Sequence, residues 1–373
     1  SFNRQRWLLS HGDALCLADV DYMAFRHQVR SAAWQSDFLA KPLAERQAIA
    51  LGLRQQSQVE HDKRQQSGLA YADVDSAAAV AQLQAAHDVL YDPLLVDDTA
   101  RLLLEAATAH ALVVRNRTPV RGALLAAMAR CTVVGRLGVG LDNIDVAGCE
   151  ARGMQVIPAT GANALSVAEY VLTCALMLLR GAYQSSTVVA QGQWPRAGLS
   201  NGREIAGKTM GLLGFGSIGQ LSAQLARGVG MNVVAHDALL AADHPSFRGS
   251  GVRSVGLDEL IATSDVLSLH VPLVNGTRGL FDAGRIACMK RGAVLINTAR
   301  GGIVDEVALA AALKSGHLGG AAIDVFGSEP LPASPHFDGC PNLLLTPHIA
   351  GVSAESNERV SFLIADKVLE ALR

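Results

Sequence analysis

The sequence predicts an α/β protein built from two parallel-sheet domains. Short Val-, Leu- and Ile-rich runs alternate with Ala-rich helical patterns from Ser76 onward, which is typical of strands and helices that follow one another in a parallel sheet. Half of the 373 residues are hydrophobic and 36 are glycine, a composition that suits many tight turns. A glycine-rich hexapeptide, GFGSIG, also follows directly after an apolar run and leads into a helical pattern.

The overall composition argues against several classes of protein. The chain carries 32 basic and 34 acidic residues and no long basic run, so nucleic-acid binding is not expected. Its 6 cysteines form no Cys-x-x-Cys pair, which favours a reduced, cytoplasmic protein without a structural metal. The most apolar run, VAEYVLTCALMLL, contains Glu169 and is too short to span a bilayer, and no signal-peptide pattern is visible at the start.

The first part of the chain predicts a helical extension followed by a small sheet. Residues 1–75 contain a helical pattern, PLAERQAIALGLRQQS, which begins at Pro42, and a polar linker, HDKRQQSG, at 61–68. A helix in SAAAVAQLQAAHDVLYDP then precedes three short apolar strands. We expect these strands at Ala111–Val114, Thr132–Val134 and Met154–Ile157.

A second, longer series of strands and helices follows. A long amphipathic helix, Ser166–Arg180, connects the two series. Strands are expected at Met210–Leu213, at Met231–Ala235, at Ala293–Ile296, in the run that ends near Asp324, and in NLLLT before His348. A final helix, Ala354–Leu372, closes the chain.

The glycines of GFGSIG have distinct physical roles. Gly214 makes a tight turn, Gly216 allows the backbone to approach a pyrophosphate, and Gly219 allows the helix to pack on the strand. The phosphates then meet the positive end of the helix that follows. Asp237 ends the next strand, where a carboxylate binds ribose hydroxyls and repels a 2′-phosphate, so the pattern predicts NAD rather than NADP. The alternative is that Asp237 only caps the end of that strand.

Three further strand ends carry groups suited to the reduction of a 2-keto acid. This reaction needs a permanent cation for the carboxylate and carbonyl, a group that gives and takes a proton near neutral pH, and a carboxylate that favours the protonated form of that group. Arg300, His348 and Glu329 supply these three functions in turn. Each residue alone also has an ordinary structural interpretation. Because the carboxyl ends of parallel strands meet at one edge, we expect them to lie together.

These patterns assign the parts of the chain. We expect two Rossmann- or flavodoxin-like domains with the active site in the cleft between them. The substrate domain is expected at 76–157 plus 348–373, and the NAD-binding domain at 158–347. Residues 1–75 precede both as the helical extension.

Residues 76–373 resemble the D-isomer-specific 2-hydroxyacid dehydrogenase family. The matching stretches occur in family order and are VVRNRT, VGRLGVGLDNID, GANALSVAEYVL, GLLGFGSIG, LHVPL, LINTARGGIVDE, AAIDVFGSEP and LTPHIAG. The phosphoglycerate dehydrogenase branch is similar in GVGLDNIDVAGCEARGMQVI, and sulfolactate dehydrogenases are similar in PATGANALSVAEY. Leu165 stands where a basic residue would help to bind a phosphate, and Asn116 replaces the Ser of the common Arg-Ser-Arg-Thr segment. Both differences put phosphoglycerate in doubt.

The resemblance implies roles for individual residues. Arg300 binds substrate, Glu329 supports the acid/base, and His348 transfers the proton. Substrate contacts are also implied for Asn116, Asn163 and the backbone N–H groups of Val139 and Gly140. The implied cofactor contacts are Gly214, Gly216, Ser217, Ile218, Gly219, Asp237, His270, Val271, Pro272, Thr298, Ala299, Asp324 and Gly351. The family further implies a homodimer formed mainly through the NAD-binding domain.

A second resemblance concerns the N-terminal extension. Residues 6–57, which contain the triplet His11-Gly12-Asp13, resemble the later part of UDP-2,3-diacylglucosamine pyrophosphatase, a two-metal phosphoesterase. Such a site needs six or more ligands, and the chain has no Asp-x-His, Gly-Asp-x-x-Asp, Gly-Asn-His-Asp or Gly-His-x-His motif. We therefore expect no metal and no phosphoesterase activity. A different alternative for the whole chain is a non-catalytic NAD sensor or corepressor on the same fold.

Overall fold

The computed structural model describes residues 41, 74–92 and 95–373. They divide into two compact units. The first unit contains the described residues up to Thr160 and the segment Asn357–Arg373, and the second unit is Gly161–Ser356. The helix that the sequence predicts from Pro42, the linker and the pyrophosphatase-like stretch 6–57 lie outside the described residues. Residues 348–356 fall in the second unit, whereas the sequence assigned them to the substrate domain.

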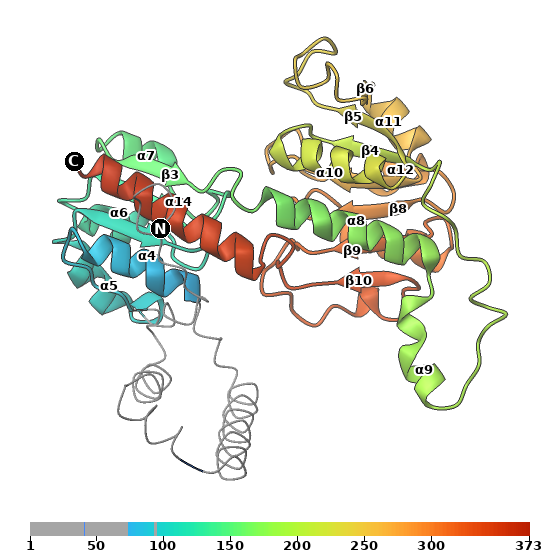
Figure 1. The fold of residues 1–373 in the computed structure, drawn as a ribbon, viewed down its shortest axis with the longest axis horizontal. Coiled ribbons are helices and arrows are strands. Elements are labelled where there is room, and N and C mark those ends of the chain that lie inside the picture. The colour runs from blue at the N-terminus through green and yellow to red at the C-terminus, as the bar shows by residue number, and fades with distance from the viewer. Residues whose placement is uncertain (1–40, 42–73, 93–94) are drawn as a thin grey trace. The chain divides into compact units, whose positions relative to one another are not determined.

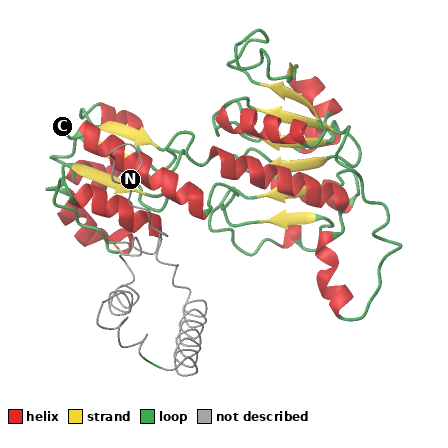
Figure 2. Cartoon of the chain, viewed as in Figure 1, coloured by secondary structure: helices red, strands yellow, loops and turns green. Residues whose placement is uncertain are grey.

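The first unit contains a parallel sheet in the order β1-β2-β3 (Figures 1 and 2). Its strands are β1 (Ala111–Val114), β2 (Val133–Arg136) and β3 (Gln155–Pro158). Its helices are α4 (Val74–Gln84), η2 (Leu95–Asp97), α5 (Thr99–Ala106), α6 (Gly122–Ala127), α7 (Val146–Glu150) and most of α14 (Ala354–Ala371).

Two layers of helices bury this small sheet. Leu102 of α5 and Leu124 and Leu125 of α6 form a buried cluster with Val114 and Val134 of the strands. Helix α14 covers another part of β2, where Gly135 is in contact with it. A Cβ at Gly135 would lie 2.7 Å from Ile364 Cγ2, so only glycine allows this approach.

The second unit contains a seven-stranded parallel sheet in the order β10-β9-β8-β7-β4-β5-β6. Its strands are β4 (Thr209–Leu213), β5 (Asn232–His236), β6 (Arg253–Ser254), β7 (Val266–Leu269), β8 (Val294–Asn297), β9 (Gly320–Ile323) and β10 (Leu343–Leu345). The chain adds β5 and β6 on one side of β4 and then returns to add β7 on the other. The strand order therefore reverses between β4 and β7, which is where ligands bind in open sheets of this kind.

Helices cover both faces of the large sheet (Figure 1). The covering helices are α8 (Ala164–Arg180), α10 (Ser217–Gly228), α11 (Leu257–Thr263), α12 (Ala283–Ala287), α13 (Glu306–Lys314) and η4 (Pro335–Phe337). After α8, the chain forms η3 (Tyr183–Ser185) and α9 (Ser186–Ala190), and α9 lies away from the sheet (Figure 1). Alternate strand residues point to opposite faces. Met210 and Leu212 of β4 thus pack with α8 and α10, whereas Leu213 packs with α11, α12 and α13.

Most of the elements expected from the sequence are confirmed, with shifts of one or two residues. β1 has the expected bounds, and α8 begins at Ala164, two residues before the expected Ser166. The first expected helix is shorter than predicted because α4 ends at Gln84. The rest of that stretch, AAHDVLYDP, contains residues with weak helix propensity and ends in a proline, which disfavours helical backbone before it.

Two glycines allow a test of the packing of the second unit. A Cβ at Gly211, in the middle of β4, would lie 1.9 Å from Ser264 Oγ, whereas a Cβ at Gly228, at the end of α10, would meet nothing within 4 Å. We expect Gly211→Ala to destabilise the protein by about 1–3 kcal/mol through overpacking. Gly228→Ala should leave the melting temperature unchanged or slightly higher, because alanine favours helix. Equal melting temperatures for both variants in a thermal unfolding experiment would contradict this packing.

Candidate active site

Most of the residues that directly follow the strands of the large sheet are polar or glycine, and they lie at its carboxyl end. Because all strands are parallel, their last residues lie along the same edge. Apart from β6, which is followed by Val255, the strands are directly followed by Gly214 after β4, Asp237 after β5, His270 after β7, Thr298 after β8, Asp324 after β9 and Thr346 after β10. Five of these six are cofactor residues expected from the sequence, and Thr346 is not.

The turn between β4 and α10 has the form expected of a dinucleotide loop. Gly214 has a positive φ of 96°, and a Cβ there would lie 2.6 Å from the carbonyl oxygen of His270. A Cβ at Gly219 would lie 2.4 Å from the carbonyl oxygen of Gly214, so both glycines are required by close backbone contact. By contrast, a Cβ at Gly216 would meet nothing within 4 Å. Gly216 therefore leaves open space before the first turn of α10, where Ser217 and Ile218 begin the helix.

Asp237 ties this loop to β5. Its Oδ2 accepts a hydrogen bond from the N–H of Phe215 at 2.8 Å, and its Oδ1 accepts one from the N–H of Leu239 at 2.9 Å. The carboxylate therefore lies beside the glycine loop. Each of its oxygens has a further lone pair for a ligand hydroxyl.

Two buried polar atoms at this edge have no hydrogen-bond partner among the described residues, namely His270 Nε2 and Thr298 Oγ1. Burial lowers the pKa of His270 to about 4, so its imidazole is neutral at pH 7. Unpaired buried polar atoms are rare in proteins and indicate a ligand or water. Together with the open space at Gly216, they show that the edge fits a dinucleotide. Val271 packs against the core beside Gly214, and the carbonyl of Pro272 accepts a hydrogen bond from Thr277 Oγ1 at 2.6 Å.

Arg300 lies in a turn that Asn297 holds. The buried side chain of Asn297 accepts a hydrogen bond from the N–H of Ala299 at 3.1 Å and donates one to the carbonyl of Arg300 at 3.0 Å. The next residue, Gly301, is in direct contact with a neighbouring loop. A Cβ at Gly301 would lie 1.8 Å from the carbonyl oxygen of Phe326. The turn that carries Arg300 therefore packs against the start of the loop that carries Glu329.

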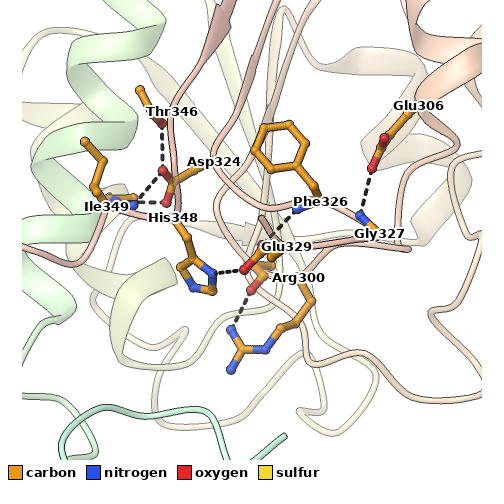
Figure 3. Close-up of polar contacts among 11 residues, drawn as sticks. Arg300, Glu306, Asp324, Phe326, Gly327, Glu329, Thr346, His348 and Ile349 are labelled. Carbon is orange, nitrogen blue, oxygen red and sulfur yellow. Dashed lines mark hydrogen bonds and ion pairs between the residues drawn. The ribbon is translucent and has the colours of Figure 1, made fainter. Parts of the chain in front are cut away.

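Glu329 and His348 form a charged or hydrogen-bonded pair beside Arg300 (Figure 3). His348 Nδ1 lies 2.7 Å from Glu329 Oε2, and the other oxygen, Oε1, accepts the N–H of Phe326 at 2.9 Å. The His348 side chain is 41 % exposed, so its second ring nitrogen is accessible to a ligand. The structure thus brings together all three catalytic residues expected from the sequence.

Asp324 is buried, whereas the side chains of His348 and Glu329 are partly exposed. Only 1 % of it is exposed, and its carboxylate accepts the N–H groups of Ile349 and Ala350, each at 2.8 Å. It also accepts the hydroxyl of Thr346 at 2.6 Å, so it contacts the chain on both sides of His348.

The expected substrate residues of the first unit lie in two turns. Asn116 belongs to the turn after β1, which Asn143 braces by donating hydrogen bonds to the carbonyls of Arg115 and Thr118 at 3.0 and 2.7 Å. Val139 and Gly140 belong to the turn after β2. Their two N–H groups donate to no described residue of the chain. Adjacent backbone N–H groups of this kind suit a carboxylate.

Asn163 and Gly351 lie together in the second unit. Asn163 Oδ1 is buried without a partner among the described residues, and a Cβ at Gly351 would lie 2.4 Å from Asn163 Nδ2. Nearby, Ser166 Oγ lies 3.1 Å from Ser353 Oγ. Gly351 therefore allows the segment after His348 to approach the start of α8.

The sequence did not point to several residues that shape this site. Glu306 Oε1 accepts the N–H of Gly327 at 2.8 Å and so braces the Glu329 loop from α13 (Figure 3). Tyr170 Oη lies 2.5 Å from Thr346 Oγ1. Both contacts join distant parts of the chain, which a local pattern does not reveal. Near Glu306, the sequence itself indicates only a helix start, since Asp305 in the stretch VDE caps α13.

The described residues contain neither a group suited to a metal ion nor a helix suited to span a membrane. Residues 41, 74–92 and 95–373 contain no group of three or more His, Cys, Asp or Glu side chains arranged to hold a metal ion. Within the same ranges no helix has the length and apolar character needed to cross a membrane.

Comparison with known proteins identifies the family. Residues 172–350 match the family model described as the D-isomer specific 2-hydroxyacid dehydrogenase, NAD binding domain. The chain is 52 % identical over 295 residues to the (S)-sulfolactate dehydrogenase of Chromohalobacter salexigens, which covers 79 % of this chain and 95 % of that protein.

Other relatives are more distant. The D-3-phosphoglycerate dehydrogenase of Mycobacterium leprae is 39 % identical over 275 residues, and the match covers 74 % of this chain but only 51 % of that protein. The structure of the D-lactate dehydrogenase of Aquifex aeolicus, solved with NAD and lactic acid, matches with a TM-score of 0.62 and 30 % identity. The match covers 72 % of this chain and 84 % of the Aquifex chain.

These relatives give no support to the pyrophosphatase-like interpretation of residues 6–57, to phosphoesterase activity or to a non-catalytic NAD sensor. The family model supports an NAD-binding domain at residues 172–350. The chain belongs to the D-isomer specific 2-hydroxyacid dehydrogenase family and is an NAD-dependent oxidoreductase that transfers a hydride between nicotinamide and C2 of a small D-2-hydroxy or 2-keto acid.

Proposed function

We propose that His348 is the general acid and base of this reaction and that Glu329 orients it. The observation that carries this proposal is the 2.7 Å contact between His348 Nδ1 and Glu329 Oε2. The contact fixes one ring nitrogen and leaves the other, Nε2, to give a proton to the carbonyl oxygen of a keto acid or to take it from a hydroxyl. Bound NAD supplies or accepts the hydride.

Arg300 is proposed to hold the substrate. Its guanidinium is planar and permanently charged, so it can bind a carboxylate and polarise the adjacent carbonyl. The turn at Asn297–Gly301 fixes its backbone. Asn116, Val139, Gly140 and Asn163 are proposed as further substrate contacts, with residues 76–157 as the main part of the substrate domain.

The proposed substrate pair is 3-sulfopyruvate and (S)-3-sulfolactate. The 52 % identity to a sulfolactate dehydrogenase supports this choice over phosphoglycerate. Leu165, at the position where a basic residue would assist a phosphate, is 41 % exposed and offers apolar surface. The S descriptor of sulfolactate agrees with a D-specific family. In sulfolactate the sulfur-bearing carbon has a higher substituent priority than the carboxylate, whereas in lactate the methyl group has a lower one. (S)-Sulfolactate and D-lactate, which is (R)-lactate, therefore have the same spatial arrangement at C2.

We also propose a cytoplasmic homodimer. Large apolar side chains are exposed on and after η3 and α9, namely Tyr183, Val189 and Trp194, and Trp194 is 77 % exposed. Clusters of exposed apolar side chains often mark protein interfaces. Sedimentation of the purified chain would decide between monomer and dimer.

A panel of keto acids tests the substrate. We expect NADH oxidation to be fastest, as kcat/KM, with 3-sulfopyruvate, and slower with phosphohydroxypyruvate, hydroxypyruvate, pyruvate and glyoxylate. Higher kcat/KM for phosphohydroxypyruvate would contradict the proposed substrate. Absorbance traces that stay flat for every acid, despite tight NADH binding, would instead favour a sensor.

His348→Ala tests the acid and base. We expect kcat to fall by about 10²–10⁴-fold, the usual loss when a general acid–base group is removed. Fluorescence titration should show unchanged NADH affinity. The exposed His87 provides a control, since His87→Ala should keep full activity. Undiminished turnover in His348→Ala would refute the role of His348.

Asp237→Asn tests the choice between NAD and NADP. The amide oxygen can still accept the N–H of Phe215, but the negative charge beside a 2′-phosphate is gone. We expect the ratio of NADPH to NADH affinity to rise about fivefold or more. Asp243→Asn, an exposed change nearby, should leave the ratio unchanged. An equal loss of affinity for both nucleotides would mean that Asp237 only supports the loop.

A further inference from the structure

The backbone of His348 is in an unusual conformation. Its φ is +56°, in the left-handed region that residues other than glycine rarely occupy. Neighbouring structure must therefore hold the chain in this conformation, and sites of this kind are often functional. The conformation decides where the imidazole lies relative to Glu329.

Asp324 is the residue that holds this turn. Its carbonyl accepts the N–H of His348 at 2.8 Å, and its two carboxylate oxygens accept the next two N–H groups, those of Ile349 and Ala350 (Figure 3). Three successive amides thus bind to one buried residue. Charge-assisted hydrogen bonds of this type are stronger than those between neutral groups.

The carboxylate is in turn connected to helix α8. Thr346 Oγ1 donates to Asp324 Oδ1 at 2.6 Å. Because a hydroxyl has one hydrogen and an ionised carboxylate only accepts, the hydrogen of Thr346 is committed to Asp324. Tyr170 Oη, which lies 2.5 Å from Thr346 Oγ1, must then be the donor in that contact. Burial raises the pKa of Tyr170, so its hydroxyl keeps the proton that it donates.

We propose that Tyr170 is a positioning residue for the dehydrogenase reaction, which acts through Thr346 and Asp324 to hold His348 against Glu329. The inference rests on the proposed role of His348. Tyr170 is well placed for this task, because Val167 and Val171 anchor α8 in the core beside it. The hydrogen bonds from Tyr170 to Thr346 and from Thr346 to Asp324 thus connect α8 to the turn at His348. Tyr170 acts on this turn through Thr346 and Asp324 and not directly on the imidazole.

Tyr170→Phe and Thr346→Val test the chain of hydroxyls. We expect each to lower kcat about five- to tenfold, the effect of losing one hydrogen bond that maintains the reactive geometry. KM for the keto acid and the NADH dissociation constant should stay within about twofold. Hydrogen exchange measured by mass spectrometry should become faster in the peptide that contains Ile349 and Ala350. Tyr91→Phe, at an exposed position, and Thr263→Val, at a partly exposed position at the end of α11, are the matched controls.

The double variant provides a stricter test. Because Tyr170 acts only through Thr346, Tyr170→Phe should have no further effect on kcat in the Thr346→Val background. Additive losses would overturn the proposed chain. So would a Tyr170→Phe variant with a lower melting temperature and an unchanged kcat, or one in which NADH affinity falls and kcat does not. Failure of the proposed function is distinguishable, since His348→Ala would then retain activity.

Discussion

The common direction of the strands in the large sheet is the constraint on which the rest of this site depends. Parallel strands place all their carboxyl ends at one edge, and the reversal of strand order between β4 and β7 opens that edge to a ligand. The glycine loop, Asp237, His270, Arg300 and Asp324 all follow from this arrangement. They are widely spaced in the chain, yet each requires only that its own strand end at the correct residue.

Much of this arrangement could be predicted from the sequence because it rests on local patterns. Apolar runs predicted all the strands except β6 and β7 to within one or two residues, and Gly214 and Gly219 of GFGSIG lie in close backbone contact. The contacts of Glu306 and Tyr170 could not be predicted in this way. Each joins residues that are far apart in sequence, Glu306 with Gly327 and Tyr170 with Thr346. Nothing in either local sequence identifies the partner.

Two buried polar groups at the sheet edge differ in their hydrogen bonding. His270 is buried with an unpaired Nε2, so the cost of desolvation favours its neutral form. Asp324 is buried as well, but it accepts two backbone N–H groups and a hydroxyl. These hydrogen bonds satisfy both oxygens of its buried side chain. The same edge thus holds a neutral imidazole and a fully bonded acid a few strands apart, and the sequence alone distinguishes neither.

The contact at Gly301 couples the positions of two segments that are separate in the sequence. Any side chain at this position would collide with the backbone of Phe326, so the turn with Arg300 packs directly against the start of the loop with Glu329. A larger residue at 301 would therefore have to displace one segment from the other, and the positions of Arg300 and Glu329 would change together.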